Sequence, residues 1–300
     1  MQFGIMDMQI GALIPKGAAT LESAMAHITG FDHVGLVRGL FEQGFNPIEL
    51  GGDLMLFFPN SYAQPTIERL AALKQETGLR YTMHLPLWSV EPSTPLAQVR
   101  QGSAQALIDA IRATLPLAPE AYVLHATGAL AAEFYQMRLP PEGKALILKQ
   151  FQVYAAQSIR RILEETGIPS RRLAVETIEF PFELTLELAE GLDTSFCLDT
   201  GHVLAGFAGP VDLFEALEQI LPRLGEVHLH DAPWQGPEHK IGYGKDHQPL
   251  GRADLDVARL LDRLEAAHYS GPVLFELTVE EARASLEYIR TLRPALLASQ

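Results

Sequence analysis

The sequence predicts a (β/α)8 barrel, and two observations support this prediction. Apolar runs of strand length alternate with segments of helical period, and eight such runs are the number that closes a parallel barrel. Several of these runs also end in an ionisable residue. Seven apolar runs end in this way, at Glu49, His84, His125, Glu176, Asp199, Asp231 and Glu276. Because burying such a group at a strand end is costly, these residues indicate a site at one mouth of the barrel.

The elements follow one another in regular order. Each candidate strand is a short apolar run bounded by turn residues. The predicted strands are Phe3–Met6, Pro47–Leu50, Arg80–His84, Ala121–His125, Leu173–Glu176, Ser195–Asp199, Glu226–His230 and Pro272–Leu277. The predicted helices are Pro65–Thr77, Leu96–Thr114, Glu142–Glu165, Val211–Leu221, Leu255–Ala267 and Glu280–Leu297. The segment Met8–Asp32 is poorly periodic, and we expect an active-site loop that leads into a helix.

An open doubly wound sheet is the competing architecture. No Gly-x-Gly-x-x-Gly motif follows the first strand, where a dinucleotide-binding fold would carry it. No linker, charge block or low-complexity tract interrupts the sequence, so we expect residues 1–300 to form one domain.

Composition narrows the class of partner. The formal net charge of −14 disfavours nucleic acid, which is bound through a basic surface, and also disfavours an anionic membrane. We expect a small-molecule substrate. No apolar run approaches the ~20 residues of a membrane span, and Met1–Asp7 is read as a first strand rather than a signal peptide, so the expected location is the cytoplasm. The single Cys197 is expected to be buried, and the oligomeric state is left open.

Carboxylates end two of the predicted strands, at Glu176 and Glu276. Each needs a cation or strong donors, and few arginines lie near strand ends to provide an ordinary salt bridge. In Asp199-Thr-Gly-His202 the strand delivers the aspartate, and the tight turn returns His202 to the same mouth. The alternative role for Asp199 is a helix N-cap, but the residues that follow do not form a convincing long helix.

Histidines occupy three further strand ends and one loop. His228 and His230 are two residues apart, so both are predicted to face the barrel interior. His84 and His125 end neighbouring strands and would hold a second metal or bind substrate. His247 lies in a glycine-rich loop after the seventh strand, where it would either close over the site or remain in solvent.

The remaining candidates have weaker patterns. Glu49 would contact ligand or pair with a base. Trp88 and Trp234 flank the expected mouth and would stack on a substrate ring or act as apolar lids. The histidines without a strand-end position are expected on the surface: His27, His33, His239 and His268.

In combination, Glu176, Asp199-x-x-His202, His228 in Val-His-x-x-Asp, and Glu276 resemble the metal core of the xylose-isomerase-like barrels. That superfamily contains sugar isomerases and epimerases and the endonuclease IV phosphodiesterases. The resemblance implies one to three divalent ions per chain, with Zn, Mn, Fe and Co equally compatible with the ligand types. It also implies catalytic roles for Glu176, Glu276 and His202.

The phosphodiesterase branch adds two histidines on strands three and four and one after strand seven. His84, His125 and His247 resemble these additions, and the resemblance makes all three metal ligands. The pattern departs at Lys245, where the endonucleases have an aspartate, so a third metal stays open. We expect Lys245 and His230, together with the two tryptophans, to bind substrate.

A metal-dependent phosphodiesterase of small molecules reconciles this ligand set with the acidic composition. The stretches His84-Leu-Pro-Leu-Trp88-Ser and Val123-Leu-His125-Ala-Thr resemble the cobamide-remodelling phosphodiesterases of the superfamily, which cut the nucleotide loop of a corrinoid. The alternative is a sugar or sugar-phosphate isomerase or epimerase in which Glu176 and Glu276 act as acid and base. A non-catalytic ligand-binding barrel is the third possibility.

Overall fold

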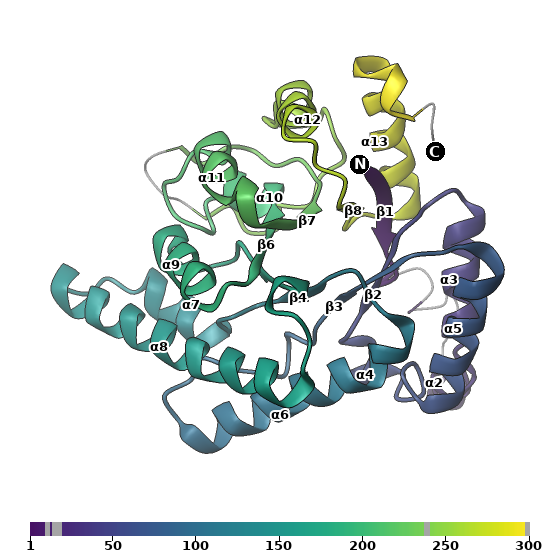
Figure 1. The fold of residues 1–300 in the computed structure, drawn as a ribbon, viewed down its shortest axis with the longest axis horizontal. Helices are drawn as coiled ribbons and strands as arrows, with labels where there is room; N and C mark the ends of the chain where they lie inside the picture. Colours follow the sequence, from purple (N-terminus) through teal and green to yellow (C-terminus); the bar gives the residue numbers. More distant parts are fainter. Residues whose placement is uncertain (10–12, 14–19, 237–240, 298–300) are drawn as a thin grey trace.

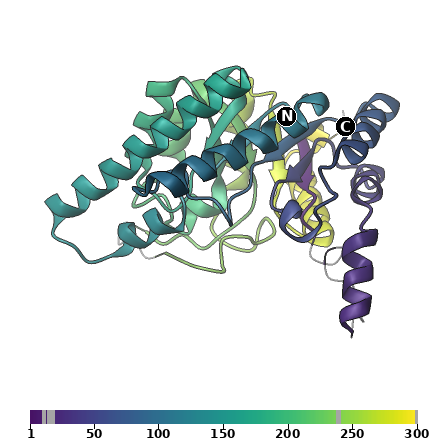
Figure 2. The same cartoon turned by 90° about the horizontal axis from the view of Figure 1, so that it is seen from below.

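The chain forms a closed barrel of eight parallel strands in the order β1 to β8, in a computed structural model that describes residues 1–9, 13, 20–236 and 241–297. The predicted (β/α)8 fold is therefore confirmed. Figure 1 shows helices around the barrel, and the long helices α6 and α8 lying together on one side. Figure 2 shows the same pair of helices from below. No helix in the described ranges has the length and apolar character needed to cross a membrane.

All eight predicted strands are present, with small differences at their ends. The strands are β1 Gln2–Met6, β2 Ile48–Gly51, β3 Tyr81–His84, β4 Tyr122–Leu124, β5 Leu173–Glu176, β6 Ser195–Asp199, β7 Leu224–His228 and β8 Pro272–Phe275. The predicted strands extended too far at His125, His230 and Glu276, which lie just beyond the paired residues. The regular strands stop one or two residues earlier, and the side chains of His125 and Glu276 line a cavity at the mouth of the barrel.

The helices cover the outer face of the barrel. They are α2 Leu21–Gly30, α3 His33–Glu42, α4 Leu54–Phe57, α5 Gln64–Thr77, α6 Ala97–Thr114, α7 Ala129–Gln136, α8 Pro141–Thr166, α9 Phe182–Leu192, α10 Thr200–Leu204, α11 Leu213–Ile220, α12 Val257–Ala266 and α13 Val279–Leu292. Short 3-10 turns are Leu115–Leu117, Ser170–Arg172, Leu221–Arg223 and Pro294–Leu297. Each predicted helix is found within a few residues, except that the last one ends at Leu292 and a 3-10 turn follows. Helix α2 lies within the segment for which the sequence predicts a loop that leads into a helix.

A buried ion pair joins the first two strands to helix α3. Asp7 and His33 are both almost fully buried, and His33 Nε2 lies 2.6 Å from Asp7 Oδ2. The other oxygen of Asp7 accepts a hydrogen bond from the Gly51 amide at 2.8 Å, and His33 Nδ1 donates to the Ser61 carbonyl at 3.0 Å. The surface position predicted for His33 is wrong, because its ring has acceptors on both sides and is held inside by them.

This pair should stabilise the barrel in a pH-dependent manner. Burial alone would lower the pKa of His33, but the hydrogen bond and charge of Asp7 outweigh it and raise that pKa. The raised value means that the contribution is complete below the unfolded pKa of about 6.5 and is lost as the pH rises through the folded pKa. We expect His33→Leu to lower the free energy of unfolding by about 3 kcal/mol at low pH, because Asp7 loses its partner.

The measurement is urea unfolding of both proteins at about pH 5.5 and about pH 9, and the difference between them should shrink at the higher pH. Arg38→Ala is the control, since Arg38 lies on the same helix but pairs with Glu76 on the surface, where such pairs contribute about 0–1 kcal/mol. A destabilisation that stays equal at both pH values would contradict the ionic role.

Strand β1 passes close to its neighbours at Gly4. A Cβ atom at this position would lie 2.0 Å from the Pro47 carbonyl oxygen and 2.8 Å from Leu274 Cδ1. We therefore expect Gly4→Ala to cost about 1–3 kcal/mol of stability through forced displacement of the strand. Gly102→Ala in the exposed part of α6, where nothing lies within 4 Å, should instead stabilise by about 0.5–1 kcal/mol. Thermal unfolding of the two variants checks both signs.

Candidate metal centre

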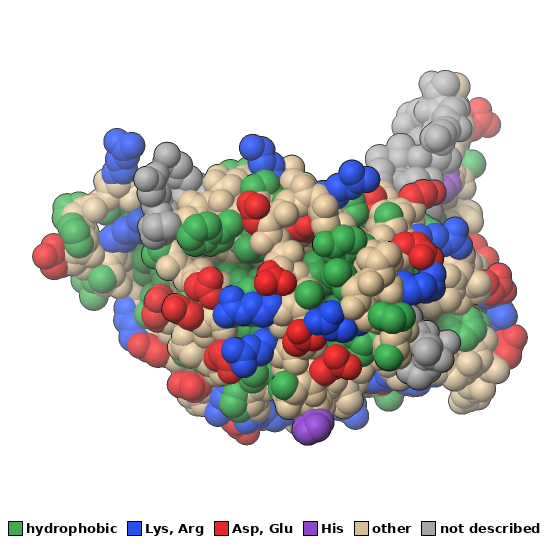
Figure 3. Space-filling model, turned by 90° about the horizontal axis from the view of Figure 1, so that it is seen from above, with side chains coloured by type: hydrophobic (Ala, Val, Ile, Leu, Met, Phe, Trp, Pro, Cys, Tyr) green, Lys and Arg blue, Asp and Glu red, His purple; other side chains and the backbone are tan. Residues whose placement is uncertain are grey.

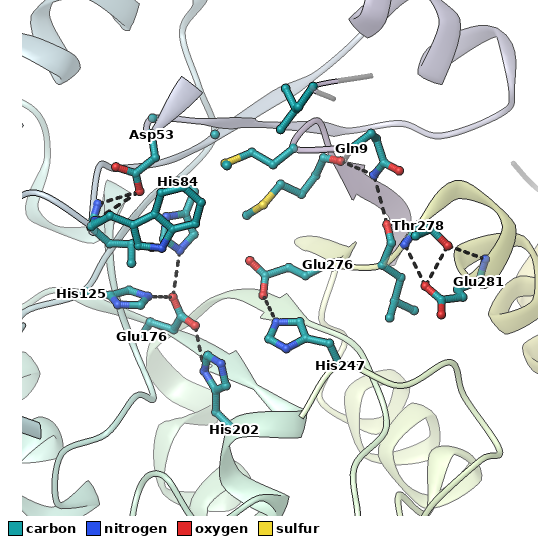
Figure 4. Close-up of a pocket in the computed structure, with 18 residues that line it drawn as sticks. Gln9, Asp53, His84, His125, Glu176, His202, His247, Glu276, Thr278 and Glu281 are labelled. Carbon is teal, nitrogen blue, oxygen red and sulfur yellow. Dashed lines mark hydrogen bonds and ion pairs between the residues drawn. The ribbon is translucent and has the colours of Figure 1, made fainter. Parts of the chain in front are cut away.

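The ionisable residues that end the apolar runs gather at the carboxyl end of the barrel. Figure 4 shows Glu176 directed toward His84, His125 and His202, with Glu276 and His247 across the cavity. The contributing positions are the ends of β3, β5, β6 and β7, the residues just after β4 and β8, helix α10, and the loop after β7. The structure thus brings together His84, His125, Glu176, Asp199, His202, His228, His247 and Glu276.

Glu176 is the residue on which the imidazoles converge. One oxygen, Oε2, lies 2.8 Å from His125 Nε2 and 3.1 Å from His84 Nε2. The other, Oε1, lies 3.2 Å from His202 Nδ1 and 3.6 Å from His228 Nδ1. Burial by itself would raise the pKa of Glu176, but these imidazoles outweigh burial and hold the pKa well below its usual range. Glu176 is therefore a buried carboxylate that stays charged.

Three carboxylates approach one nitrogen of His228. His228 Nδ1 lies 3.6 Å from Glu176 Oε1, 3.8 Å from Asp199 Oδ2 and 3.6 Å from Glu276 Oε1. Bonds of about 2.0–2.2 Å to one tetrahedral metal would separate its ligand atoms by about 3.3–3.6 Å, close to these distances. His228 Nδ1 is buried and has no hydrogen-bond partner among the described residues. The donor set fits a divalent ion.

His84 and His125 form a second group of donors with Glu176. Their rings are 5.1 Å apart, and both present Nε2 to the same oxygen of Glu176. His84 Nδ1 contacts the Leu85 carbonyl at 3.0 Å, which leaves Nε2 without a proton in the neutral tautomer. A metal ion beside Glu176 would bind Nε2, and it requires this nitrogen to be free of its proton.

Asp199 has two functions at the end of β6. Oδ1 accepts a hydrogen bond from the His202 amide at 2.6 Å and caps α10, while Oδ2 lies 2.9 Å from His230 Nε2. The helix-cap role, which the sequence disfavoured, is thus present, because a five-residue helix is sufficient for capping. Capping turns His202 back toward Glu176 and leaves Oδ2 directed at the cluster.

Two carboxylates lie beneath the mouth, inside the barrel. Glu49 pairs with a base, since its Oε2 lies 3.3 Å from His228 Nε2. Glu226, which the sequence analysis missed, is fully buried, and neither of its carboxylate oxygens has a geometric hydrogen-bond partner in the described ranges. Burial, reinforced by the Glu49 charge, raises the pKa of Glu226 well above its usual range. Its position two residues before His228 was the available signal for an inward-facing side chain.

A third group of donors includes the loop after β7. His247 Nδ1 lies 2.6 Å from Asp246 Oδ2 and its Nε2 lies 3.2 Å from Glu276 Oε2, while His202 Nε2 lies 3.9 Å from Asp246. Burial lowers the pKa of His247, but the hydrogen bonds to Asp246 and Glu276 outweigh this and raise it to about 11. The endonuclease pattern has an aspartate at the position of Lys245. In this chain the neighbouring Asp246 contacts His247 instead.

Asp231 positions this loop. Its backbone pairs with Gln248 in both directions, at 2.7 and 2.9 Å. Its carboxylate accepts hydrogen bonds from the amides of Arg252, Ala253 and Leu255 at 2.8–3.0 Å. Asp231, the last residue of the Val-His-x-x-Asp element, therefore holds the loop in place. None of these hydrogen bonds joins it to a candidate metal ligand.

A cavity of about 570 Å³ lies above the centre and is referred to below as the large cavity. Trp88 lines it, and this residue is 60% exposed. Trp234 and Lys245 do not line the large cavity, and His230 is fully buried against Asp199, so the substrate contacts predicted for these three are not seen there. The loop faces outward at Trp234 and Lys245, whereas the two-residue repeat of β7 directs His230 inward.

Among the other histidines, His27 is half-buried with its Nε2 3.2 Å from the Leu13 carbonyl oxygen, and His268 is exposed. His239 lies outside the described residues.

Known proteins share this fold and parts of this sequence. "Probable endonuclease 4" of Mycobacterium leprae is 24% identical over 246 residues, covering 80% of this chain and 90% of the relative. A D-tagatose 3-epimerase-like protein superposes with a TM-score of 0.68 at 18% identity and 97% coverage of both chains. Endonuclease IV from Thermus thermophilus superposes with a TM-score of 0.63 at 18% identity, covering 97% of this chain and 98% of its own.

These relatives include both epimerases and endonucleases, so the reaction type is not decided by similarity. The family is decided, because its sequence pattern matches residues 37–292, which span the strands β2 to β8 and every candidate ligand named above. The chain belongs to the Xylose isomerase-like TIM barrel family.

Proposed function

We propose that this protein is a metal-dependent phosphodiesterase that hydrolyses a small-molecule phosphodiester, with the nucleotide loop of a cobamide as the substrate. One observation carries the proposal: His84 and His125 both direct Nε2 at Oε2 of Glu176, whereas His228 contacts the other oxygen, Oε1. A single-metal isomerase does not need this second group. A binuclear hydrolase does, because two ions stabilise the attacking and leaving oxygens of the displacement.

The residues divide the work between two adjoining sites. Glu176, shared by both donor groups, would bridge them, with Asp199, His228 and Glu276 on one side and His84 and His125 on the other. His202 and His247 lie at the cavity wall and would orient the phosphoryl group or hold a further ion. One to three bound divalent ions would activate a water molecule and neutralise charge on the phosphoryl oxygens.

The surface supports a small substrate rather than duplex DNA. The formal net charge is −14, whereas phosphate contacts along a duplex need clustered lysines and arginines. On the face seen in Figure 3, these cations are scattered among aspartates and glutamates and form no continuous patch.

A sugar epimerase is the second candidate, and one observation favours it. Glu176 and Glu276 approach the same imidazole nitrogen of His228 at 3.6 Å each, so two carboxylates flank one metal position. Such a pair would serve as acid and base on a sugar carbon. In that case His84 and His125 would bind substrate instead of metal.

The first test compares the two reactions directly. Purified protein should contain about two divalent ions per chain, and it should release nitrophenolate from bis(p-nitrophenyl) phosphate and cleave an intact cobamide. Elemental analysis, absorbance and chromatography of the products measure these outcomes. Epimerisation of a free ketose without cleavage of either diester would replace the proposal with the epimerase.

The second test removes the additional donor group. We expect His84→Ala/His125→Ala to lose one metal equivalent together with phosphodiester cleavage, and to retain the second equivalent on Asp199, His228 and Glu276. The loss of activity should exceed the 10–100-fold typical of residues that only support metal ligands.

His268→Asn is the matched control, because His268 is exposed and lines neither the large cavity nor any group of candidate ligands among the described residues. This variant should keep full metal content and activity. Full metal content in the double variant would show that the two histidines are not ligands.

A further inference from the structure

A second cavity of about 290 Å³ adjoins the large cavity and is referred to here as the small cavity. Four residues line both spaces: Leu87, Trp88, His125 and His202. His125 and His202 both contact Glu176, as Figure 4 shows, so the candidate metal centre lies where the two cavities meet. A group bound at the centre would therefore have space on both sides.

Among the residues that the structure describes, neither cavity has a lysine or an arginine in its wall. The ionisable residues beyond the centre are acids, Asp53 and Glu281 in the large cavity and Glu91 and Glu179 in the small one. A further phosphate held away from the histidines of the centre would face these carboxylates, with no described lysine or arginine beside it.

The two cavities differ in chemical character. Methionine and leucine side chains line much of the large cavity, including Met6, Met8, Leu87 and Leu277. The wall of the small cavity contains Glu91, Thr127, Gly128 and Glu179. Apolar side chains, among them Val90, Ile178 and Phe207, complete the wall of the small cavity. The large cavity suits a bulky apolar group, whereas the small cavity suits a smaller group that combines apolar and polar atoms.

Trp88 is held in position at the boundary. Asp53 Oδ2 accepts hydrogen bonds from the Leu87 and Trp88 amides at 3.0 and 3.4 Å, which fixes the backbone of this turn. The Trp88 ring packs edge-on against Phe57, with centroids 5.9 Å apart, and the residue as a whole remains 60% exposed. An anchored aromatic ring that remains exposed is suited to stack on a flat ligand group.

We propose that the substrate spans both cavities, with a bulky, apolar, ring-containing ester group against Trp88 in the large cavity and a smaller group in the small cavity. This inference rests on the proposed phosphodiesterase function. Neither ester group carries a phosphate of its own. Hydrolysis forms a bond from the water oxygen to phosphorus and breaks one phosphorus–oxygen ester bond. The released alcohol takes a proton, and a phosphomonoester remains.

The two tryptophans of the chain provide a matched pair for the test. Trp234 is 52% exposed and lines a separate depression with Leu204 and Asp212. Trp234→Phe leaves Trp88 as the only tryptophan, and Trp88→Phe leaves Trp234. We expect diphenyl phosphate to change the emission of the Trp88-only protein in a saturable way and to leave the Trp234-only protein unchanged. Phenyl phosphate and inorganic phosphate should bind at least about 10-fold more weakly.

Kinetics provide the second readout. With bis(p-nitrophenyl) phosphate, Trp88→Ala should raise KM about 10-fold with little change in kcat, because stacking contributes to binding in the ground state and the transition state alike. Trp234→Ala should change neither constant. The monoester p-nitrophenyl phosphate should be a poor substrate of every variant.

The outcomes separate this inference from the proposed function. Normal diester cleavage with an unchanged KM in Trp88→Ala would overturn the role of Trp88 and leave the phosphodiesterase intact. Cleavage of p-nitrophenyl phosphate as efficient as that of the diester would overturn the two-cavity arrangement. Saturable binding at Trp88 without cleavage by metal-loaded protein would support the binding inference and overturn the proposed function.

Discussion

The burial of the Glu176 carboxylate among imidazoles is the constraint on which the mouth of the barrel depends. A charged carboxylate at the end of an apolar strand is costly unless partners surround it, and four histidines from β3, α10, β7 and the turn after β4 supply those partners. Each histidine reaches Glu176 only if the strand, helix or turn that carries it lies at the same level along the barrel axis as the end of β5. The closed eight-stranded barrel satisfies this requirement, because all strand ends converge on one rim.

The sequence predicted most of this arrangement because the barrel converts order along the chain into position around a ring. A residue that ends a parallel strand must lie at the carboxyl rim, so Glu176, Asp199 and His228 could be placed without any knowledge of contacts. The same logic explains the correct number and location of the strands.

The sequence was less informative where placement depends on partners distant in the chain. His33 looked like a surface residue because nothing local reveals that Asp7, 26 residues earlier, will meet it in the folded chain. Glu226 was missed because it lies in the middle of its strand, and its spacing of two residues from His228 was not used. Helix α9 was missed because Leu184, Leu186 and Leu188 recur at every second position, which is the period of a strand. Trp234 and Lys245 lie in a loop whose direction is set by tertiary contacts.

The role of Asp231 has a consequence for how proteins of this architecture can diversify. The same residue holds the loop through its backbone pairing with Gln248 and through its carboxylate bonds to the amides of residues 252–255. Because position 248 is fixed directly to the end of β7, the neighbouring His247 is located independently of the length of chain that connects it to Ala232. Insertions and deletions between them would alter the rim while the imidazole kept its place. The barrel can thus acquire new substrate contacts by changing a connector instead of rebuilding its reactive centre.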